Sequence, residues 1–306
     1  MPACCNRPSI IKNYYSNIAS SNSDMIRPAF HIKAQDGAGF SPASTSLIIE
    51  IHERQLSFAW INKIERELIQ LSQYHLNADS TENDLVSVLQ ELIDGDPSLQ
   101  EQVVETTVIY NFGEASLVPE KYYSIEICKP VVELSAGNVN KGLVLSEKIK
   151  GSDIYSVYRI PKSTHGLLQR KFSAGKYWHC YSLLLSDANP ANTDPLLKLY
   201  FYPDKFILTA FRNQQLLLAQ RFAYQVPEDV SYHLLSVCRQ FEIEPGSAQL
   251  LLTGLIDRDS ALHGEIERYF LHIDIDILGT NAWKNQPQHD YPPHYFSPLL
   301  QMALCV

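Results

Sequence analysis

The stretch Leu47-Ile48-Ile49-Glu50-Ile51 decides the fold, because the pattern that it opens occurs twice in the chain. It begins three expected strands joined by short polar turns, and Leu197-Lys198-Leu199-Tyr200-Phe201 begins the same run again. Apolar, β-branched and aromatic runs between turn residues indicate strands. The expected strands are 47–51, 56–61 and 68–74, then 197–201, 206–211 and 216–224. The copies align without a gap, which predicts a duplication and two similar α/β lobes with a cleft between them.

The elements after each group of three strands also correspond. The next helices begin near Thr81 and Pro227, where residues suited to helix N-termini occur. Further strands are expected over 106–112 and 249–253, and further helices over 119–127 and 260–270. Continuous apolar runs such as Leu250-Leu251-Leu252 are typical of strands buried on both faces of a parallel sheet.

The segment between the copies completes the first lobe. It predicts two strands within 142–161, a short helix over 162–172 and a strand over 179–185. The Asp, Asn and Pro residues of 187–195 favour a linker. The expected parts are an N-terminal tail that is poorly ordered in part, two lobes and a C-terminal tail with a short helix, over 1–44, 45–190, 196–285 and 286–306. The C-terminal tail is expected to pack back on a lobe, or else to dock a partner.

Composition limits the classes of function. The 306 residues are 45% hydrophobic and 19% charged, which suits globular cores. The formal net charge is −9, and an acidic chain without a basic stripe is a poor candidate for binding nucleic acid. No stretch approaches the roughly 20 apolar residues that span a bilayer. Residues 1–24 lack the apolar core of a signal peptide, and Met25 is an alternative start. Six cysteines without C-x-x-C spacing favour a reduced, cytoplasmic protein.

Several short motifs in a fixed order resemble those of a known family. They are Leu47 to Ile51 with Leu56-Ser57-Phe58, Ala115 to Pro119, Leu251-Leu252-Thr253-Gly254 with Asp259-Ser260, and His294-Tyr295-Phe296. The chain resembles an uncharacterised bacterial family of unknown function with an actin-like ATPase fold, distantly similar to FtsA and PilM. The resemblance covers most of the chain from about Ser46. It implies two tandem ribonuclease-H-like lobes, as in actin, Hsp70 and hexokinase, each a mixed sheet with flanking helices.

The resemblance also implies where a nucleotide would bind. Active members of that superfamily hold ATP and Mg²⁺ between the lobes, with an Asp-x-Gly motif in the first hairpin of each lobe. Glycine lets backbone amides approach phosphate, and the carboxylate organises Mg²⁺. Here the first hairpin has Glu50-Ile51-His52, and the second has Tyr200-Phe201-Tyr202, with neither acid nor glycine. The adenosine-side motif keeps Gly254 but continues with Leu255.

The implied cofactor-binding candidates at the cleft are Glu50, His52, Asp204, Thr253 and Gly254. No bound cofactor is predicted, with ATP and Mg²⁺ as the alternative. Three of these residues have a structural interpretation as well. Glu50 suits an outward residue of a half-exposed hairpin, His52 a solvated turn, and Gly254 the end of a strand where the backbone turns.

Other chemistry has weaker support. A nuclease of this fold needs several carboxylates around two metals, whereas only Glu50 lies on a suitable first strand and the third strand adds Glu67. The ten histidines form no HxH or HxxxH pair and have no cysteine at zinc spacing. The alternating His272, Asp274 and Asp276 suggest a solvated strand face. Ser163-Thr164-His165 is not interpreted as a nucleophile with its base, because adjacent helical residues do not face each other.

Three hypotheses follow. The first is a non-catalytic interaction or scaffold protein with an actin-like fold, a degenerate nucleotide site and a protein partner. The second is an ATP-binding switch or weak ATPase with atypical phosphate loops, in which Glu50 coordinates Mg²⁺. The third is a metal-dependent nuclease. The sequence names no catalytic residue and no metal ligand, and it does not identify the partner or the oligomeric state.

Overall fold

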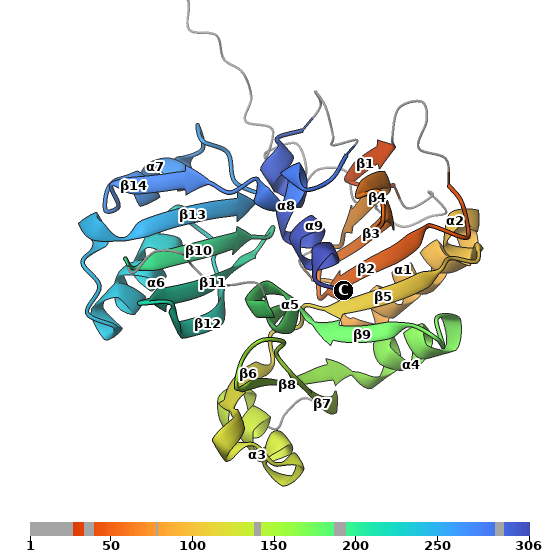
Figure 1. Cartoon of the computed structure of the whole chain (residues 1–306), viewed down its shortest axis with the longest axis horizontal. Helices are drawn as coiled ribbons and strands as arrows, with labels where there is room; N and C mark the ends of the chain where they lie inside the picture. Colours follow the sequence, from red (N-terminus) through yellow and green to blue (C-terminus); the bar gives the residue numbers. More distant parts are fainter. Residues whose placement is uncertain (1–26, 34–39, 78, 138–141, 187–193, 285–290) are drawn as a thin grey trace, which may run out of the picture.

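The structure is a computed structural model that describes residues 27–33, 40–77, 79–137, 142–186, 194–284 and 291–306. Figure 1 shows two lobes side by side, each built on a twisted sheet, with a group of helices between them. A smaller three-stranded sheet extends from the first lobe. The predicted class, two α/β lobes with mixed sheets and flanking helices, is confirmed.

The first lobe contains a six-stranded sheet with the order β1-β4-β3-β2-β5-β9. The strands are β1 (Phe30–Lys33), β2 (Ser46–His52), β3 (Gln55–Asn62), β4 (Glu67–His75), β5 (Glu105–Tyr110) and β9 (Lys176–His179). β2 pairs antiparallel with β3 and parallel with β5, so an antiparallel meander continues into a parallel half-sheet. One face is covered by α1 (Glu82–Gly95), α2 (Pro97–Gln100) and α4 (Lys162–Lys171).

The second lobe repeats this plan in a five-stranded sheet with the order β12-β11-β10-β13-β14. The strands are β10 (Leu196–Phe201), β11 (Lys205–Arg212), β12 (Gln215–Ala223), β13 (Gln249–Gly254) and β14 (His272–Ile275), with helices α6 (Pro227–Gln240) and α7 (Ala261–Glu267). The strand pairing shifts register at equivalent places, between Trp60 and Ile61 and between Ala210 and Phe211. The predicted duplication of the meander is therefore confirmed down to a shared irregularity.

The side-chain alternation of the strands explains the apolar runs in the sequence. On β2, Leu47 and Ile49 belong to the cluster against α1, whereas Ile48 belongs to the cluster between the lobes. On β10, Leu199 packs in the cluster with α6 and Tyr200 in the one between the lobes. Both faces of β2 and β10 are therefore buried, which is the environment that favours near-continuous apolar strands.

The inner faces of the two sheets meet through a hydrophobic core. This central cluster contains Ile48 from the first lobe, Ile207 from the second, Leu184 of α5 (Cys180–Ser186) and Leu300 of α9 (Ser297–Leu304). Figure 1 shows α5, α9 and the short α8 (Leu278–Asn281) lying between the lobes. Full burial of one such aliphatic side chain contributes about 1.5–3 kcal/mol, so the joint between the lobes is part of the folded core.

The C-terminal segment contacts both lobes. In the first lobe, the Phe296 ring meets the Phe30 ring of β1 edge to face, with 5.5 Å between the ring centroids. In the second lobe, the Thr253 hydroxyl donates to the His294 carbonyl at 3.2 Å. The predicted terminal helix is present as α9, and residues 291–306 connect the lobes rather than packing on one. Residues 286–290 of the predicted tail lie outside the described residues, and the boundaries proposed between the parts remain a prediction.

The three-stranded sheet lies between β5 and β9 in the sequence. It has the order β6-β8-β7, with β6 (Ala115–Pro119), β7 (Gly142–Lys148) and β8 (Ile154–Pro161), and it carries η2 (Glu120–Tyr122) and α3 (Ile125–Ala136). The two strands predicted within 142–161 and the helix over 162–172 are confirmed. A helix predicted over 119–127 is present with other bounds: Pro119 ends a strand that pairs with β8, η2 follows, and α3 starts only at Ile125.

A second correction concerns residues 179–185, which were predicted to form a strand. Only His179 belongs to a strand, β9, and Cys180–Ser186 forms helix α5. The run is apolar throughout and almost fully buried, so it has no period that could distinguish a buried strand from a buried helix.

The N-terminal tail predicted over 1–44 contributes a strand, because β1 pairs antiparallel with β4 at the edge of the first sheet. Its residues 1–26 and 34–39 lie outside the described residues, as does most of the predicted linker 187–195. Among the described helices, none is long and apolar enough to cross a membrane.

Candidate functional site

The first hairpins of the two lobes touch each other at their tips. β2 and β3 are joined by Glu53 and Arg54, and the β10–β11 connection contains Asp204. The Arg54 guanidinium lies 2.9 Å from the Asp204 carboxylate, which joins one hairpin tip to the other. Both residues are partly exposed, so this ion pair alone contributes at most about 1 kcal/mol.

Glu50, on β2 of the same hairpin, is buried, with 2% of its surface exposed. Its Oε1 accepts a hydrogen bond from the Tyr202 hydroxyl at 2.8 Å and another from the Asn111 side-chain amide at 2.8 Å. Burial raises the pKa of Glu50, although both hydrogen bonds act in the opposite direction. The prediction that Glu50 is an outward hairpin residue is wrong, since its strand is covered on both faces.

His52 is also buried, and the prediction of a solvated turn residue is wrong. Its Nδ1 accepts a hydrogen bond from the Arg54 backbone N–H at 3.2 Å. Its ring meets the Tyr202 ring edge to face, with 5.4 Å between the centroids. Burial and the nearby positive charge of Lys205 hold the pKa of His52 well below 6.5, so the imidazole is neutral at physiological pH.

Charged residues that the sequence did not single out complete this cluster. The buried Lys205 ammonium donates to the Asn111 carbonyl at 2.8 Å and lies 3.6 Å from the Glu53 carboxylate. Arg221 from β12 donates to both Glu53 oxygens at 2.8 Å. Burial lowers the pKa of Lys205 to about 8. For Glu53, burial acts to raise the pKa, but Lys205 and Arg221 outweigh it and hold the pKa far below its usual value.

We call this set of residues the interlobe cluster: Glu50, His52, Glu53, Arg54, Asn111, Tyr202, Asp204, Lys205 and Arg221. It joins five residues of the first lobe to four of the second. Its members are separated by 94 to 168 positions in the contacts that cross the lobes through Lys205, Tyr202 and Arg221. The structure thus brings together Glu50, His52 and Asp204, three of the predicted cleft candidates. No local pattern in the sequence indicated that Asn111, Lys205 and Arg221 would join them.

The structure places two of the predicted candidates elsewhere. The buried Thr253 donates to the C-terminal segment, as described above. Gly254 has a φ of +84°, and a Cβ atom there would lie 2.2 Å from the Phe201 carbonyl oxygen of the neighbouring strand β10. The contact with β10 and the positive φ give this glycine a structural role, which agrees with its interpretation as the end of a strand.

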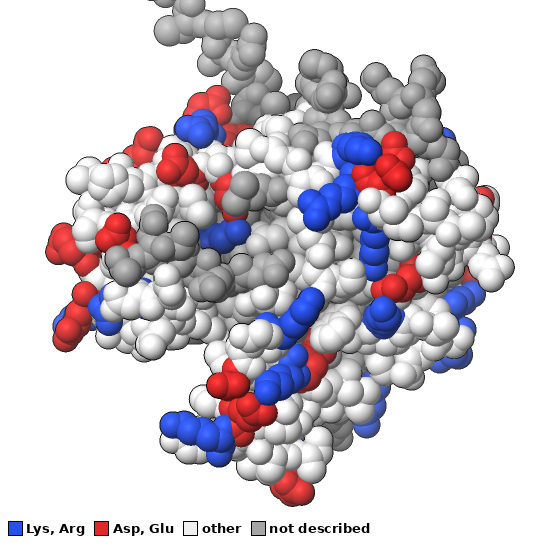
Figure 2. Space-filling view, viewed as in Figure 1, with Lys and Arg blue, Asp and Glu red and all other residues white. Residues whose placement is uncertain are grey.

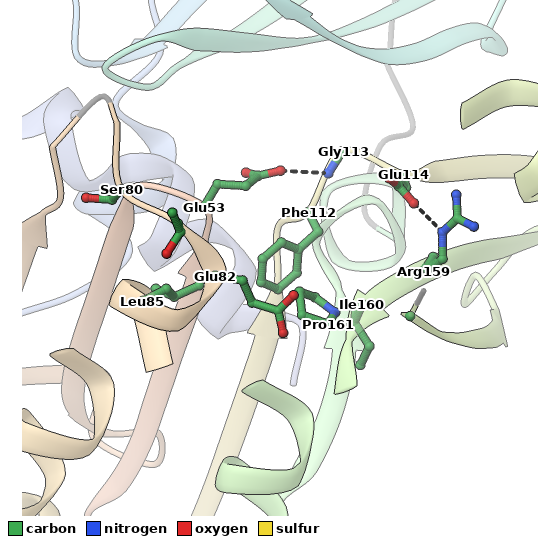
Figure 3. Close-up of a pocket in the computed structure, with 12 residues that line it drawn as sticks. Glu53, Ser80, Glu82, Leu85, Phe112, Gly113, Glu114, Arg159, Ile160 and Pro161 are labelled. Carbon is green, nitrogen blue, oxygen red and sulfur yellow. Dashed lines mark hydrogen bonds and ion pairs between the residues drawn. The ribbon is translucent and has the colours of Figure 1, made fainter. Parts of the chain in front are cut away.

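Two cavities adjoin the cluster. A small one of about 10 Å³ is lined by Glu50, Gln55, Tyr202 and residues of the C-terminal segment. A larger one of about 260 Å³ lies on the first lobe, where Glu53 borders the start of α1 and the three-stranded sheet (Figure 3). The first is large enough for about one water molecule.

The other residues considered in the sequence do not form a site. Asp276 is buried and pairs with Lys198 at 2.5 Å, whereas His272 and Asp274 are exposed. His165 bonds to the Tyr110 hydroxyl at 2.6 Å and Ser163 donates to Glu82, so they are not a nucleophile and its base. The described residues contain no group of three His, Cys, Asp or Glu side chains that could hold a metal ion. On the face in Figure 2, the described Lys and Arg residues are interspersed with Asp and Glu.

Solved structures with this architecture define the class of protein. A protein from Bacteroides thetaiotaomicron VPI-5482, described as having an actin-like ATPase fold and unknown function, matches with a TM-score of 0.71 and 17% identity. The match covers 85% of this chain and 96% of that one. A chain of the PilM–PilN type IV pilus biogenesis complex matches with a TM-score of 0.54 and 10% identity, over 85% and 97% of the two chains. The protein therefore has the actin-like ATPase fold.

The family follows from the sequence. Residues 40–273 match the family described as "Protein of unknown function (DUF3822)", and the chain belongs to that family. No curated protein matches the sequence. The resemblance inferred from the motifs is thus confirmed.

Proposed function

We propose that this protein is a non-catalytic actin-like protein that binds a protein partner, and that its nucleotide site has become a fixed joint between the lobes. The observation that carries the proposal is the interlobe cluster. Glu50 bonds to Tyr202, Glu53 to Arg221 and Arg54 to Asp204, so side chains of the two lobes contact each other directly. In active members of the superfamily this is the region that holds the phosphates.

The residues present do not fit ATP with Mg²⁺. Neither hairpin offers a glycine, and the Tyr202 and His52 rings pack against each other. The cavity beside Glu50 has a volume of about 10 Å³, whereas small-molecule pockets have volumes of roughly 300–1,000 Å³. A nucleotide would have to break the buried hydrogen bonds of Glu50 and Lys205 before it made its own. Each buried polar group left without a partner costs about 1–3 kcal/mol.

The proposal of a protein partner has separate support. One solved structure with the same fold is described as a complex of PilM with PilN, so the fold can serve in protein assembly. The C-terminal helix is buried between the lobes here, which leaves the outer surfaces for a partner. The described cysteines, Cys128, Cys180, Cys238 and Cys305, carry free thiols, which supports a cytoplasmic location within this proposal.

A thermal-shift titration tests the proposal. The protein is heated with ATP, ADP or GTP, each with and without Mg²⁺, up to millimolar concentrations. A ligand at 100 times its dissociation constant stabilises the fold by about 2.7 kcal/mol, a rise in Tm of roughly 5–10 °C. We expect no nucleotide-dependent rise. A rise that requires Mg²⁺ would refute the fixed joint.

A second candidate is the ATP-binding switch, and one observation favours it. Glu50 and Lys205 both belong to the interlobe cluster, and both form hydrogen bonds with Asn111. A carboxylate and an amine are the groups that could face Mg²⁺ and phosphate if the lobes separated. For this switch, Glu50→Ala would abolish nucleotide-dependent stabilisation while Arg268→Ala, on the exposed surface of the second lobe, would not.

A further inference from the structure

The pocket of about 260 Å³ lies at a place where α/β proteins commonly bind ligands. β2 ends at His52 and β5 ends at Tyr110, and the pocket is lined by the residues that follow both strands. Parallel strands bring their carboxyl ends to the same edge of the sheet, and ligands bind in the crevice outside that edge. The lining residues come from five segments, which are the β2–β3 turn, the start of α1, the residues after β5, the start of β7 and the end of β8.

The walls are apolar and the polar groups are mainly acidic. Leu85, Phe112 and Ile160 supply a hydrophobic lining, and Figure 3 shows the Phe112 ring in the middle of the pocket. Three carboxylates line the pocket together with one guanidinium, that of Arg159. Arg159 bonds to Glu114 and donates to the Gly137 carbonyl at 2.7 Å, so its charge is already engaged.

The three carboxylates differ in their partners. Glu114 pairs with Arg159, and Glu53 pairs with Arg221 and Lys205. Glu82 accepts a hydrogen bond from the Ser163 hydroxyl, and no Lys or Arg among the described residues forms an ion pair with it. Glu82 is exposed in the first turn of α1, so its carboxylate is accessible at the pocket.

We propose that this pocket receives a lysine or arginine side chain of a protein partner, with the alkyl stem against the apolar walls and the cationic head at Glu82. This inference rests on the proposed function and names the chemistry of the partner. Long basic side chains bury their methylene groups along apolar surface while the charged end stays near water. The volume is below the usual range for drug-sized ligands, so a single side chain fits better than a nucleotide.

A titration followed by backbone amide resonances tests the proposal on the full chain. The probe is N-acetyl-lysine amide, and N-acetyl-norleucine amide is the control that has the same stem without the ammonium. We expect the lysine probe to shift the Gly113, Glu114 and Ile160 resonances at millimolar concentrations. The norleucine control should bind about tenfold more weakly, as the loss of one charge-assisted contact implies. Equal binding of the two probes, or no shift at these residues, would overturn the proposal.

Two variants and a second probe locate the contact and its source. Glu82→Gln should lower the affinity for the lysine probe by about five- to tenfold. Glu91→Gln changes an exposed residue of the same helix and should leave that affinity unchanged. Equal weakening by the two variants, or no effect of Glu82→Gln, would contradict a specific role for Glu82. Cadaverine is a free diamine, and if it bound more tightly than the lysine probe, a small amine rather than a protein would be the occupant.

This test can fail separately from the proposed function. Nucleotide binding between the lobes would shift the resonances of Glu50 and Tyr202 and refute the fixed joint. An absence of lysine-probe binding would refute the assignment of the pocket and leave the fixed joint standing.

Discussion

Removing the Tyr202 hydroxyl should lower the free energy of unfolding measurably, because that hydroxyl forms a hydrogen bond between the lobes. Tyr202 is 3% exposed and donates to Glu50 at 2.8 Å. In Tyr202→Phe the ring remains, but Glu50 keeps only the hydrogen bond from Asn111. Loss of a buried hydrogen bond to a carboxyl group costs about 1–3 kcal/mol. In a chain of this size that corresponds to a fall in Tm of about 2–8 °C.

The assay is thermal and denaturant unfolding of Tyr202→Phe beside wild type. Tyr232→Phe is the matched control, since Tyr232 is 68% exposed and its loss should change stability by less than about 0.5 kcal/mol. A cycle that combines Tyr202→Phe with Glu50→Ala should give a coupling of about 0.5–3 kcal/mol. If Tyr202→Phe unfolds at the wild-type temperature, or if the two changes are additive, the contact does not hold the lobes together.

Three further predictions concern the same region. Lys205 has a pKa of about 8 in the fold against 10.5 when unfolded, so its burial costs about 3 kcal/mol below pH 8, and this cost disappears as the pH rises to 10.5. Lys205→Met should lose the resulting rise in stability, measured by denaturation across pH 7–11; a plot of unfolding free energy against pH with the wild-type slope would contradict this. Glu50→Gln should be at least as stable as wild type at pH 7, because the raised pKa of Glu50 means that its ionisation above pH 4.5 destabilises the fold. A fall of more than about 2 kcal/mol in the free energy of unfolding in urea would count against this. Gly254→Ala should lower the free energy of unfolding by at least about 2 kcal/mol, because residue 254 has a φ of +84° and lies against Phe201. Gly264→Ala, in open space on α7, should raise it by up to about 1 kcal/mol, and equal Tm values for the two variants would refute the strain at Gly254.

The meanders could be predicted from the sequence because their information is local. Apolar runs of five to nine residues between polar turns determine each strand, and the match of Leu47 with Leu197 showed that the unit occurs twice. The burial of Glu50 and His52 could not be predicted in this way. Their positions on β2 face the other lobe, and only the contact with Tyr202 reveals that this face is covered.

The errors in the sequence analysis also have local causes. The apolar run 179–185 contains no polar residue at regular spacing, so a buried helix and a buried strand gave the same pattern. Ala115 to Pro119 is short and forms a strand only through pairing with β8. The C-terminal segment carries few signals of its own, and its place between the lobes depends on contacts with β1 and β13.

The most direct measurement is a crystal structure of the full chain grown with millimolar ATP and Mg²⁺. The account predicts that Glu50 still bonds to Tyr202 and Glu53 to Arg221, with no nucleotide between the hairpins. A nucleotide in that position, with the Arg54–Asp204 contact broken and the lobes apart, would contradict the account.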